Sequence, residues 1–136
     1  MEFSEIAAYM IIGTGIDIVE IARFRKILTG TGERFLNRVF TPYEQGFCLA
    51  RRDSAPHFAA RFAAKEAVFK ALGTGWAKGV SWLDVEVYRY EHSAPLILLH
   101  GTASTLAASK GVTQIHLSLT HSDNYAAATA IIEGKL

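Results

Sequence analysis

The chain has 136 residues, of which half are apolar and a fifth are charged, and its formal net charge is +1. This size suits one domain with a single core, and so balanced a charge argues against general binding of polyanions such as nucleic acid. A lone cysteine, Cys48, excludes an intrachain disulfide and suits the reducing cytoplasm, and no apolar run reaches the roughly 18 residues that span a membrane.

The chain opens with a segment that fits no folded element. Residues 1–9 lack the basic start and long apolar run of a signal peptide. We therefore expect an N-terminal extension there, either non-native or placed before an alternative start at Met10, and one domain over residues 10–136.

The first predicted element is a strand over Met10–Val19, because a short run rich in isoleucine is typical of a buried strand. Alternation along a strand places four residues on one side: Ile11, Gly13, Gly15 and Asp17. The two glycines leave that side bare, so another group can approach the backbone closely. Asp17 is unexpected in such a run; it is either a functional carboxylate or the N-cap of the next helix.

Four helices are predicted next. Amphipathic spacing, glycine stops and a Thr-Pro-x-Glu start signal set their bounds at Glu20–Leu28, Glu33–Val39, Pro42 to about Arg51 or Arg52, and His57–Leu72. The last helix, rich in alanine and phenylalanine, is apolar nearly all round, as buried helices are.

The second half of the chain is predicted to hold four strands and one helix. Their ranges are Leu83–Tyr90, Pro95–His100, the helix Thr102–Lys110, Gln114–Thr120 and Tyr125–Ile132. The order β-α-α-α-α-β-β-α-β-β describes a single α+β domain.

The central helix carries four charges in its apolar setting: Arg61, Lys65, Glu66 and Lys70. Because unpaired buried charge is very costly, we expect these side chains to meet each other, a metal ion or a charged ligand. The alternative is a solvated stripe on which Glu66 and Lys70, four residues apart, form a pair.

Two carboxylates, Asp17 and Glu66, stand in otherwise apolar elements. Such a pair suits Mg²⁺, which takes few protein ligands and completes its shell with water and phosphate oxygens. Groups suited to a phosphate or pyrophosphate lie in the same helix and just beyond it. They are Arg61, Lys65, Lys70 and the loop Gly73-Thr74-Gly75. The residues alone therefore predict a Mg²⁺-assisted phosphoryl or phosphodiester reaction.

Three weaker signals have ordinary alternatives. The segment between residues 23 and 38 has one acid and five basic side chains, namely Arg23, Arg25, Lys26, Arg34 and Arg38. These bases form either a docking face for an acidic partner or solvated helix faces. His121 ends a predicted strand, where it either reaches a ligand or is a surface histidine. Cys48 lies between Phe47 and Leu49 and is interpreted as a core residue rather than a nucleophile.

Two blocks of the sequence resemble the signature motifs of the phosphopantetheinyl transferases. One is Gly15-Ile16-Asp17, and the other runs from Phe62 through Lys65-Glu66 to Gly75. The stretches 10–23 and 117–122 are similar to the short, bacterial branch of this family, the holo-acyl-carrier-protein synthases. The resemblance covers nearly the whole chain apart from residues 1–9.

The resemblance implies an α+β fold in which an antiparallel sheet wraps around the long central helix. It implies transfer of the 4′-phosphopantetheine arm of coenzyme A to a serine of apo-acyl carrier protein, with Mg²⁺ as cofactor and adenosine 3′,5′-bisphosphate as product. It also implies a homotrimer that binds coenzyme A in clefts between subunits and serves fatty acid synthesis, with polyketide or peptide carriers as alternatives. Composition and charge add the expectation of a cytoplasmic protein with no membrane or nucleic-acid partner.

The same resemblance implies roles for single residues. Asp17 and Glu66 hold Mg²⁺, and Glu66 takes the serine proton directly or through a metal-bound water. Lys70 stabilises charge on the pyrophosphate. Further coenzyme A contacts are implied for Arg61, Lys65, Gly73, Thr74, Gly75 and His121, and carrier protein contacts for Arg23 and Arg25.

From the residues alone, two other functions stay open. A non-catalytic module that binds coenzyme A or an acidic protein would need the basic residues but not both carboxylates. A different Mg²⁺-dependent phosphoester enzyme would carry the same carboxylate pair. An assay with coenzyme A, Mg²⁺ and an apo-carrier protein distinguishes the three functions.

Overall fold

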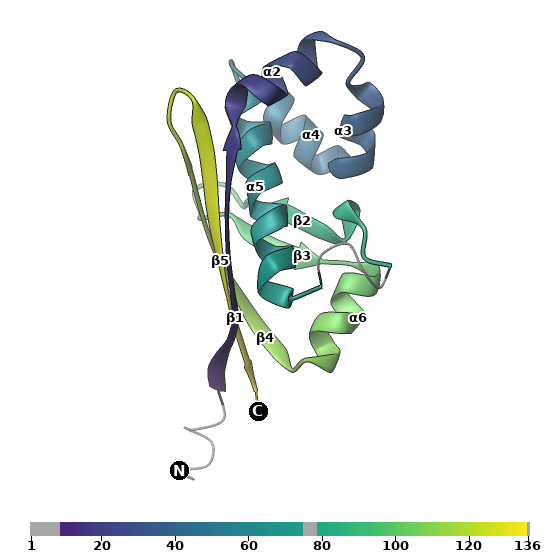
Figure 1. Cartoon of the computed structure of the whole chain (residues 1–136), viewed down its shortest axis with the longest axis vertical. Helices are drawn as coiled ribbons and strands as arrows, with labels where there is room; N and C mark the ends of the chain where they lie inside the picture. Colours follow the sequence, from purple (N-terminus) through teal and green to yellow (C-terminus); the bar gives the residue numbers. More distant parts are fainter. Residues whose placement is uncertain (1–8, 75–78, 136) are drawn as a thin grey trace.

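The structure is a computed structural model that describes residues 9–74 and 79–135. Its larger sheet has three antiparallel strands in the order β1–β5–β4, namely Tyr9–Glu20, Tyr125–Lys135 and Val112–His121. A two-stranded antiparallel sheet pairs β2, Val85–Tyr88, with β3, Leu96–Leu99. The long helix α5, Ala55–Leu72, packs along one face of the larger sheet (Figure 1). The predicted α+β class and the element order are confirmed.

The described part of the chain holds four shorter α-helices: α2 (Ile21–Thr29), α3 (Glu33–Val39), α4 (Pro42–Leu49) and α6 (Gly101–Ser109). Figure 1 shows α2, α3 and α4 gathered around the beginning of α5, and α6 packs against β4. None of the helices in the described ranges combines the length and the apolar composition that crossing a membrane requires.

Among the predicted element starts that differ from the structure, two have clear local reasons. The strand expected from Leu83 begins at Val85, because a capping box between Ser81 and Asp84 folds Trp82–Asp84 into a 3₁₀ turn. The central helix begins at Ala55 rather than His57, because Pro56 fits the first turn of a helix.

The helix α5 is buried nearly all round, as its composition predicts. Of its 18 residues, only three have more than a minimal exposed surface: His57, Glu66 and Lys70. Its phenylalanines fill the core, where the Phe62 ring lies 5.5 Å from Phe24 and 4.9 Å from Trp82. The few polar side chains that leave the core therefore mark where α5 meets solvent.

The side of β1 that carries Gly13 and Gly15 faces α5, and the helix backbone fills the space that the missing side chains leave. A Cβ atom added to Gly13 would lie 2.0 Å from the Ala71 carbonyl oxygen, and one on Gly15 would lie 1.9 Å from that of Ala67. The predicted close approach to the backbone is confirmed, but the approaching group is a helix. Ile11 does not share this side, because the β1–β5 register shifts between Ile11 and Gly13.

The opposite side of β1 is exposed, so the prediction of a fully buried strand is wrong for the single chain. Ile16 and Ile18 each keep 65% of their surface exposed, and Ile131 of the neighbouring β5 keeps 39%. We call this surface the outer sheet face. Its apolar residues explain why β1 has the composition of a strand that is covered on both sides.

Candidate active site

The carboxylates Asp17 and Glu66 converge between β1 and α5. Asp17 follows the two glycines on the helix-facing side of the strand, where the helix lies against the strand backbone. Burial and the nearby Asp17 charge raise the pKa of the half-buried Glu66 carboxyl, and the charges of Lys70 and Arg23 oppose that rise. The sequence-predicted pair therefore shares one small site, built on two rigid elements.

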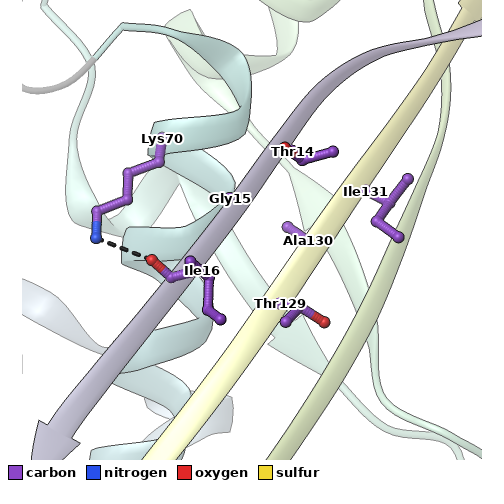
Figure 2. A pocket seen from close by; sticks show the side chains of 7 residues that line it. All are labelled: Thr14, Gly15, Ile16, Lys70, Thr129, Ala130 and Ile131. Carbon is purple, nitrogen blue, oxygen red and sulfur yellow. Dashed lines mark hydrogen bonds between the residues drawn. The ribbon is translucent and has the colours of Figure 1, made fainter.

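Lys70 spans the free edge of β1 beside these carboxylates. Its Nζ donates a hydrogen bond of 2.9 Å to the Ile16 carbonyl oxygen, which Figure 2 shows, and lies 3.1 Å from Oδ1 of Asp17. The side chain stays 52% exposed, beside an open hollow of about 490 Å³ that extends over Thr14 and Ile131. Lys70 therefore offers a positive charge that a ligand can reach from solvent.

Arg23 extends from α2 to the same site. Its guanidinium lies 5.3 Å from the centre of the Phe62 ring, and its charge lowers the pKa of Glu66. It also lines an open groove of about 580 Å³ with Lys26, Ile27, Phe35 and one acid, Glu20. Arg23 thus connects this surface groove to the carboxylate pair.

Lys65 does not fit its predicted role as a phosphate ligand, and this expectation is corrected. Its side chain is completely buried, and its Nζ lies 2.8 Å from Glu44 and donates to the carbonyl oxygens of Trp82 and Val85. Glu44 also accepts hydrogen bonds from the backbone N–H groups of Thr41 and Val87. All the donors of Lys65 therefore serve the core, and a phosphate has no path to them.

Arg61 is also buried, with 3% of its surface exposed. Its guanidinium stacks 4.0 Å from the centre of the Phe47 ring and donates to the His57 carbonyl oxygen. Its Nε has no hydrogen-bond partner among the described residues. Coenzyme A binding by Arg61 stays a prediction. Burial and the Arg61 charge lower the pKa of His57, which lines a surface cleft.

His121 lies at the end of β4, where its ring is 5.5 Å from that of His57. Both rings line an open cleft of about 440 Å³, which we call the arginine cleft. Its other polar lining residues are Arg25, Arg51, Arg52, Asp53, Ser122 and Asp123. Sequence reasoning missed Arg51, Arg52 and His57 as site candidates, although the adjacent arginines at the end of a predicted helix were a usable signal.

Arg25 faces this cleft and is held there by an acid. Its two terminal nitrogens donate to the two oxygens of Asp53, each at 2.9 Å. This bidentate pair joins α2 to the turn before α5, and it raises the pKa of Arg25 and lowers that of Asp53. Contact of Arg25 with a carrier protein stays a prediction.

The loop after α5 is described only in part. Gly73 ends the helix with a φ of 74°, the left-handed conformation that glycine adopts at helix ends, and Thr74 is buried. Gly75 lies outside the described residues. A close approach of this loop to a ligand therefore stays a prediction.

Cys48 is completely buried, and burial raises the pKa of its thiol to about 12. A thiol of this kind is protonated at neutral pH. The interpretation of Cys48 as a core residue rather than a nucleophile is confirmed.

The carboxylate pair fits Mg²⁺ but does not complete its shell. Within residues 9–74 and 79–135, no three His, Cys, Asp or Glu side chains gather as metal ligands. Mg²⁺ is commonly held by one or two carboxylates together with water and substrate phosphates. Asp17 and Glu66 meet that requirement if the substrate brings a phosphate. The site thus combines two acids for a metal ion with the exposed cation Lys70 for an anion.

The chain is similar in sequence to one family of known proteins. The sequence profile of the 4′-phosphopantetheinyl transferase superfamily matches residues 13–130. A holo-[acyl-carrier-protein] synthase of Anaeromyxobacter dehalogenans is 51% identical over 128 residues, which cover 92% of this chain and 98% of that protein.

Solved structures agree in fold as well as in sequence. The Bacillus anthracis holo-(acyl-carrier-protein) synthase in complex with CoA (3′,5′-ADP) has a TM-score of 0.75 at 34% identity, covering 93% of this chain and 99% of its own. The Helicobacter pylori synthase in complex with coenzyme A has a TM-score of 0.76 at 33% identity, covering 88% and 98%.

Proposed function

Because the chain belongs to the 4′-phosphopantetheinyl transferase superfamily, we propose that it transfers 4′-phosphopantetheine from coenzyme A to a serine of apo-acyl carrier protein. The proposal includes Mg²⁺ dependence and adenosine 3′,5′-bisphosphate as the second product. The observation that carries it is the convergence of Asp17, Glu66 and the exposed Lys70 at one point between β1 and α5. Solved relatives that bind coenzyme A supply the substrate class.

Mg²⁺, when bound, would neutralise part of the pyrophosphate charge. Asp17 and Glu66 are the residues that would hold it. Lys70, already beside Asp17, would stabilise charge on the pyrophosphate oxygens during transfer. These groups would reduce the electrostatic repulsion that a nucleophile meets when it approaches an anionic phosphate.

Glu66 is the proposed base, directly or through water. The serine oxygen forms a bond to the phosphorus that carries the pantetheine arm, and the bond from that phosphorus to the bridging oxygen breaks. The serine proton passes to the Glu66 side, and adenosine 3′,5′-bisphosphate leaves. Glu66 lies beside Asp17 and Lys70, the residues proposed to act on the pyrophosphate, so it is placed to receive this proton.

The nucleotide end of coenzyme A is proposed to lie in the arginine cleft. His121 lines this cleft, and the family resemblance implies that His121 contacts coenzyme A. Arginines suit phosphate because their N–H groups match its oxygens in pairs. Arg51 and Arg52 therefore join His121 among the proposed coenzyme A contacts.

The carrier protein is proposed to dock along the groove of α2 and α3. Arg23 and Lys26 supply positive charge there, and Ile27 and Phe35 supply apolar surface. An acidic helix with an apolar stripe would be complementary to such a groove. Since Arg23 also extends to Glu66, a carrier bound here would present its serine near the proposed base.

We also propose a homotrimer that works in cytoplasmic fatty acid synthesis. The outer sheet face supports assembly, since Ile16, Ile18 and Ile131 leave an apolar patch on a face of the sheet. The open hollow beside Lys70 extends onto this face, so a neighbouring subunit would cover one side of it.

Mass spectrometry tests the proposed transfer directly. The purified protein is incubated with coenzyme A, Mg²⁺ and an apo-acyl carrier protein, and the carrier is weighed. We expect the carrier to gain the mass of one phosphopantetheine arm, and we expect no gain when Mg²⁺ is removed by a chelator. An unchanged carrier, shown to be competent with a known transferase, would favour the binding module or another phosphoester enzyme.

A further inference from the structure

The strongest unexplained feature is the fixed position of Arg25 in the arginine cleft. The two signature motifs do not include this residue, and its assignment to the carrier protein rests on the wider family resemblance and on its basic character. The structure instead places its guanidinium in the cleft wall with Arg51, Arg52 and His121.

Arg25 and Arg23 face different surfaces. Successive residues of a helix are rotated by roughly 100°, so two positions apart they point in nearly opposite directions. Arg23 stacks on Phe62 and lines the α2–α3 groove, whereas Arg25 pairs with Asp53 across the arginine cleft. One carrier surface seated in the groove therefore contacts Arg23 without reaching Arg25.

The pair with Asp53 leaves Arg25 able to bind an anion. Arginine has about five N–H donors, and Asp53 occupies one on each terminal nitrogen, so roughly three stay free. Because Asp53 also lines the cleft, it holds the Arg25 guanidinium at the cleft wall before any ligand binds. Preorganised donors bind phosphate without the cost of ordering a long side chain.

We propose that Arg25, positioned by Asp53, binds the 3′-phosphate of coenzyme A in the arginine cleft and does not dock the carrier protein. This inference rests on the proposed function. It assigns Arg25 to substrate selection, because the 3′-phosphate distinguishes coenzyme A from its dephosphorylated precursor.

An exposed ion pair with no ligand role is the competing explanation. The side chains of Arg25 and Asp53 are 50% and 53% exposed, and pairs of this kind add little to stability. A binding measurement separates the two explanations, because a surface ion pair has no preference between nucleotides.

The test compares two nucleotides by isothermal titration calorimetry. Adenosine 3′,5′-bisphosphate carries the phosphate in question, and 5′-AMP lacks it. For Arg25→Ala we expect binding of the bisphosphate to weaken about tenfold, as loss of a charge-assisted hydrogen bond would produce. Binding of 5′-AMP should stay within about twofold, since the remaining contacts are intact.

A reversed pair tests whether the guanidinium itself matters. Arg25→Asp alone should abolish the preference for the bisphosphate. The double variant Arg25→Asp/Asp53→Arg should restore most of it, because residue 53 lines the same cleft and returns a guanidinium to it. Arg89→Ala is the matched control, because this exposed arginine lies beyond β2, outside the arginine cleft and the α2–α3 groove.

Steady-state kinetics assigns the partner. Arg25→Ala should raise the KM for coenzyme A about tenfold and leave the KM for the carrier unchanged. A raised carrier KM, or an unchanged preference between the nucleotides, would overturn the inference while transfer by the wild type continued. Failure of the wild type to modify any carrier would instead refute the proposed function.

Discussion

At the scale of single residues, two neighbours on α5 lie in different environments. Lys65 and Glu66 are adjacent, but the rotation of roughly 100° between them sends one into the core and the other toward β1. Lys65 is satisfied by Glu44 and two carbonyl oxygens, whereas Glu66 faces another acid. The motif Lys-Glu thus combines a structural cation with a functional acid.

Removing the buried cation should be strongly destabilising. For Lys65→Met we expect the free energy of unfolding to fall by about 3–5 kcal/mol, because Glu44 would remain buried and charged without its partner. Urea denaturation followed by circular dichroism measures this. The double variant Glu44→Gln/Lys65→Met should recover part of the loss, and a small effect of the single variant would contradict a strongly coupled pair.

The thiol of Cys48 should be inert in the native protein. Its pKa is raised to about 12 by burial, so it is protonated at pH 8, where Ellman's reagent is used. We expect no labelling in buffer and one reacted thiol per chain in guanidinium chloride. Rapid labelling of the native protein would show that α4 opens locally.

Glu66→Gln should separate binding from chemistry. We expect kcat to fall by about 10²–10⁴-fold, because the proposed proton acceptor is lost, while coenzyme A binding falls much less. Single-turnover kinetics and calorimetry on the same preparation measure the two quantities. Glu33→Gln, on exposed α3, is the control and should change neither. Wild-type turnover in the Glu66 variant would remove this residue from the base role.

At the scale of elements, sequence patterns located β1 and α5 because each has a strong composition. A short apolar run rich in isoleucine predicted the strand, and an alanine and phenylalanine run without glycine predicted the helix. The patterns also placed Asp17 and Glu66 on them. The distribution of charges along α5 was less predictable, because the partner of Lys65 is Glu44, an acid 21 positions away that fitted a capping box equally well.

The contact of β1 with α5 depends on Gly15. In Gly15→Ala the added methyl would meet the Ala67 carbonyl oxygen at 1.9 Å, so the helix must move away from the strand. We expect a loss of about 1–3 kcal/mol in unfolding free energy, and lower turnover, since Asp17 and Glu66 would separate.

Gly46→Ala is the matched control. Gly46 is exposed within α4, and a Cβ there would meet nothing within 4 Å. Alanine should stabilise this helix by about 0.5–1 kcal/mol. Equal effects of the two substitutions in chemical denaturation would contradict the close packing of β1 on α5.

At the scale of the whole molecule, the sequence of β1 predicts more burial than one chain supplies. Its isoleucines have the composition of a strand covered on both sides, yet α5 covers one side only. The composition of a strand predicts whether its two faces are buried. It does not predict whether the same chain or another molecule buries them. The same limit applies to the hollow beside Lys70, whose open side lies on the outer sheet face.

The proposed trimer can be tested on that face. A cyclic trimer joins different surfaces of neighbouring copies, and the outer sheet face offers two: isoleucines on β1, and polar residues such as His116 and Ser118 on β4. Ile16→Glu places a charge on the apolar part, where burial against a second copy would be costly. We expect a trimer for the wild type by sedimentation equilibrium, and a folded monomer with reduced transfer activity for the variant.

Leu49→Glu is the control. Leu49 lies away from the sheet with 59% of its surface exposed, so this substitution should leave the trimer intact. A wild-type monomer with full activity, or an Ile16→Glu variant that remains a trimer, would show that this face is not the interface.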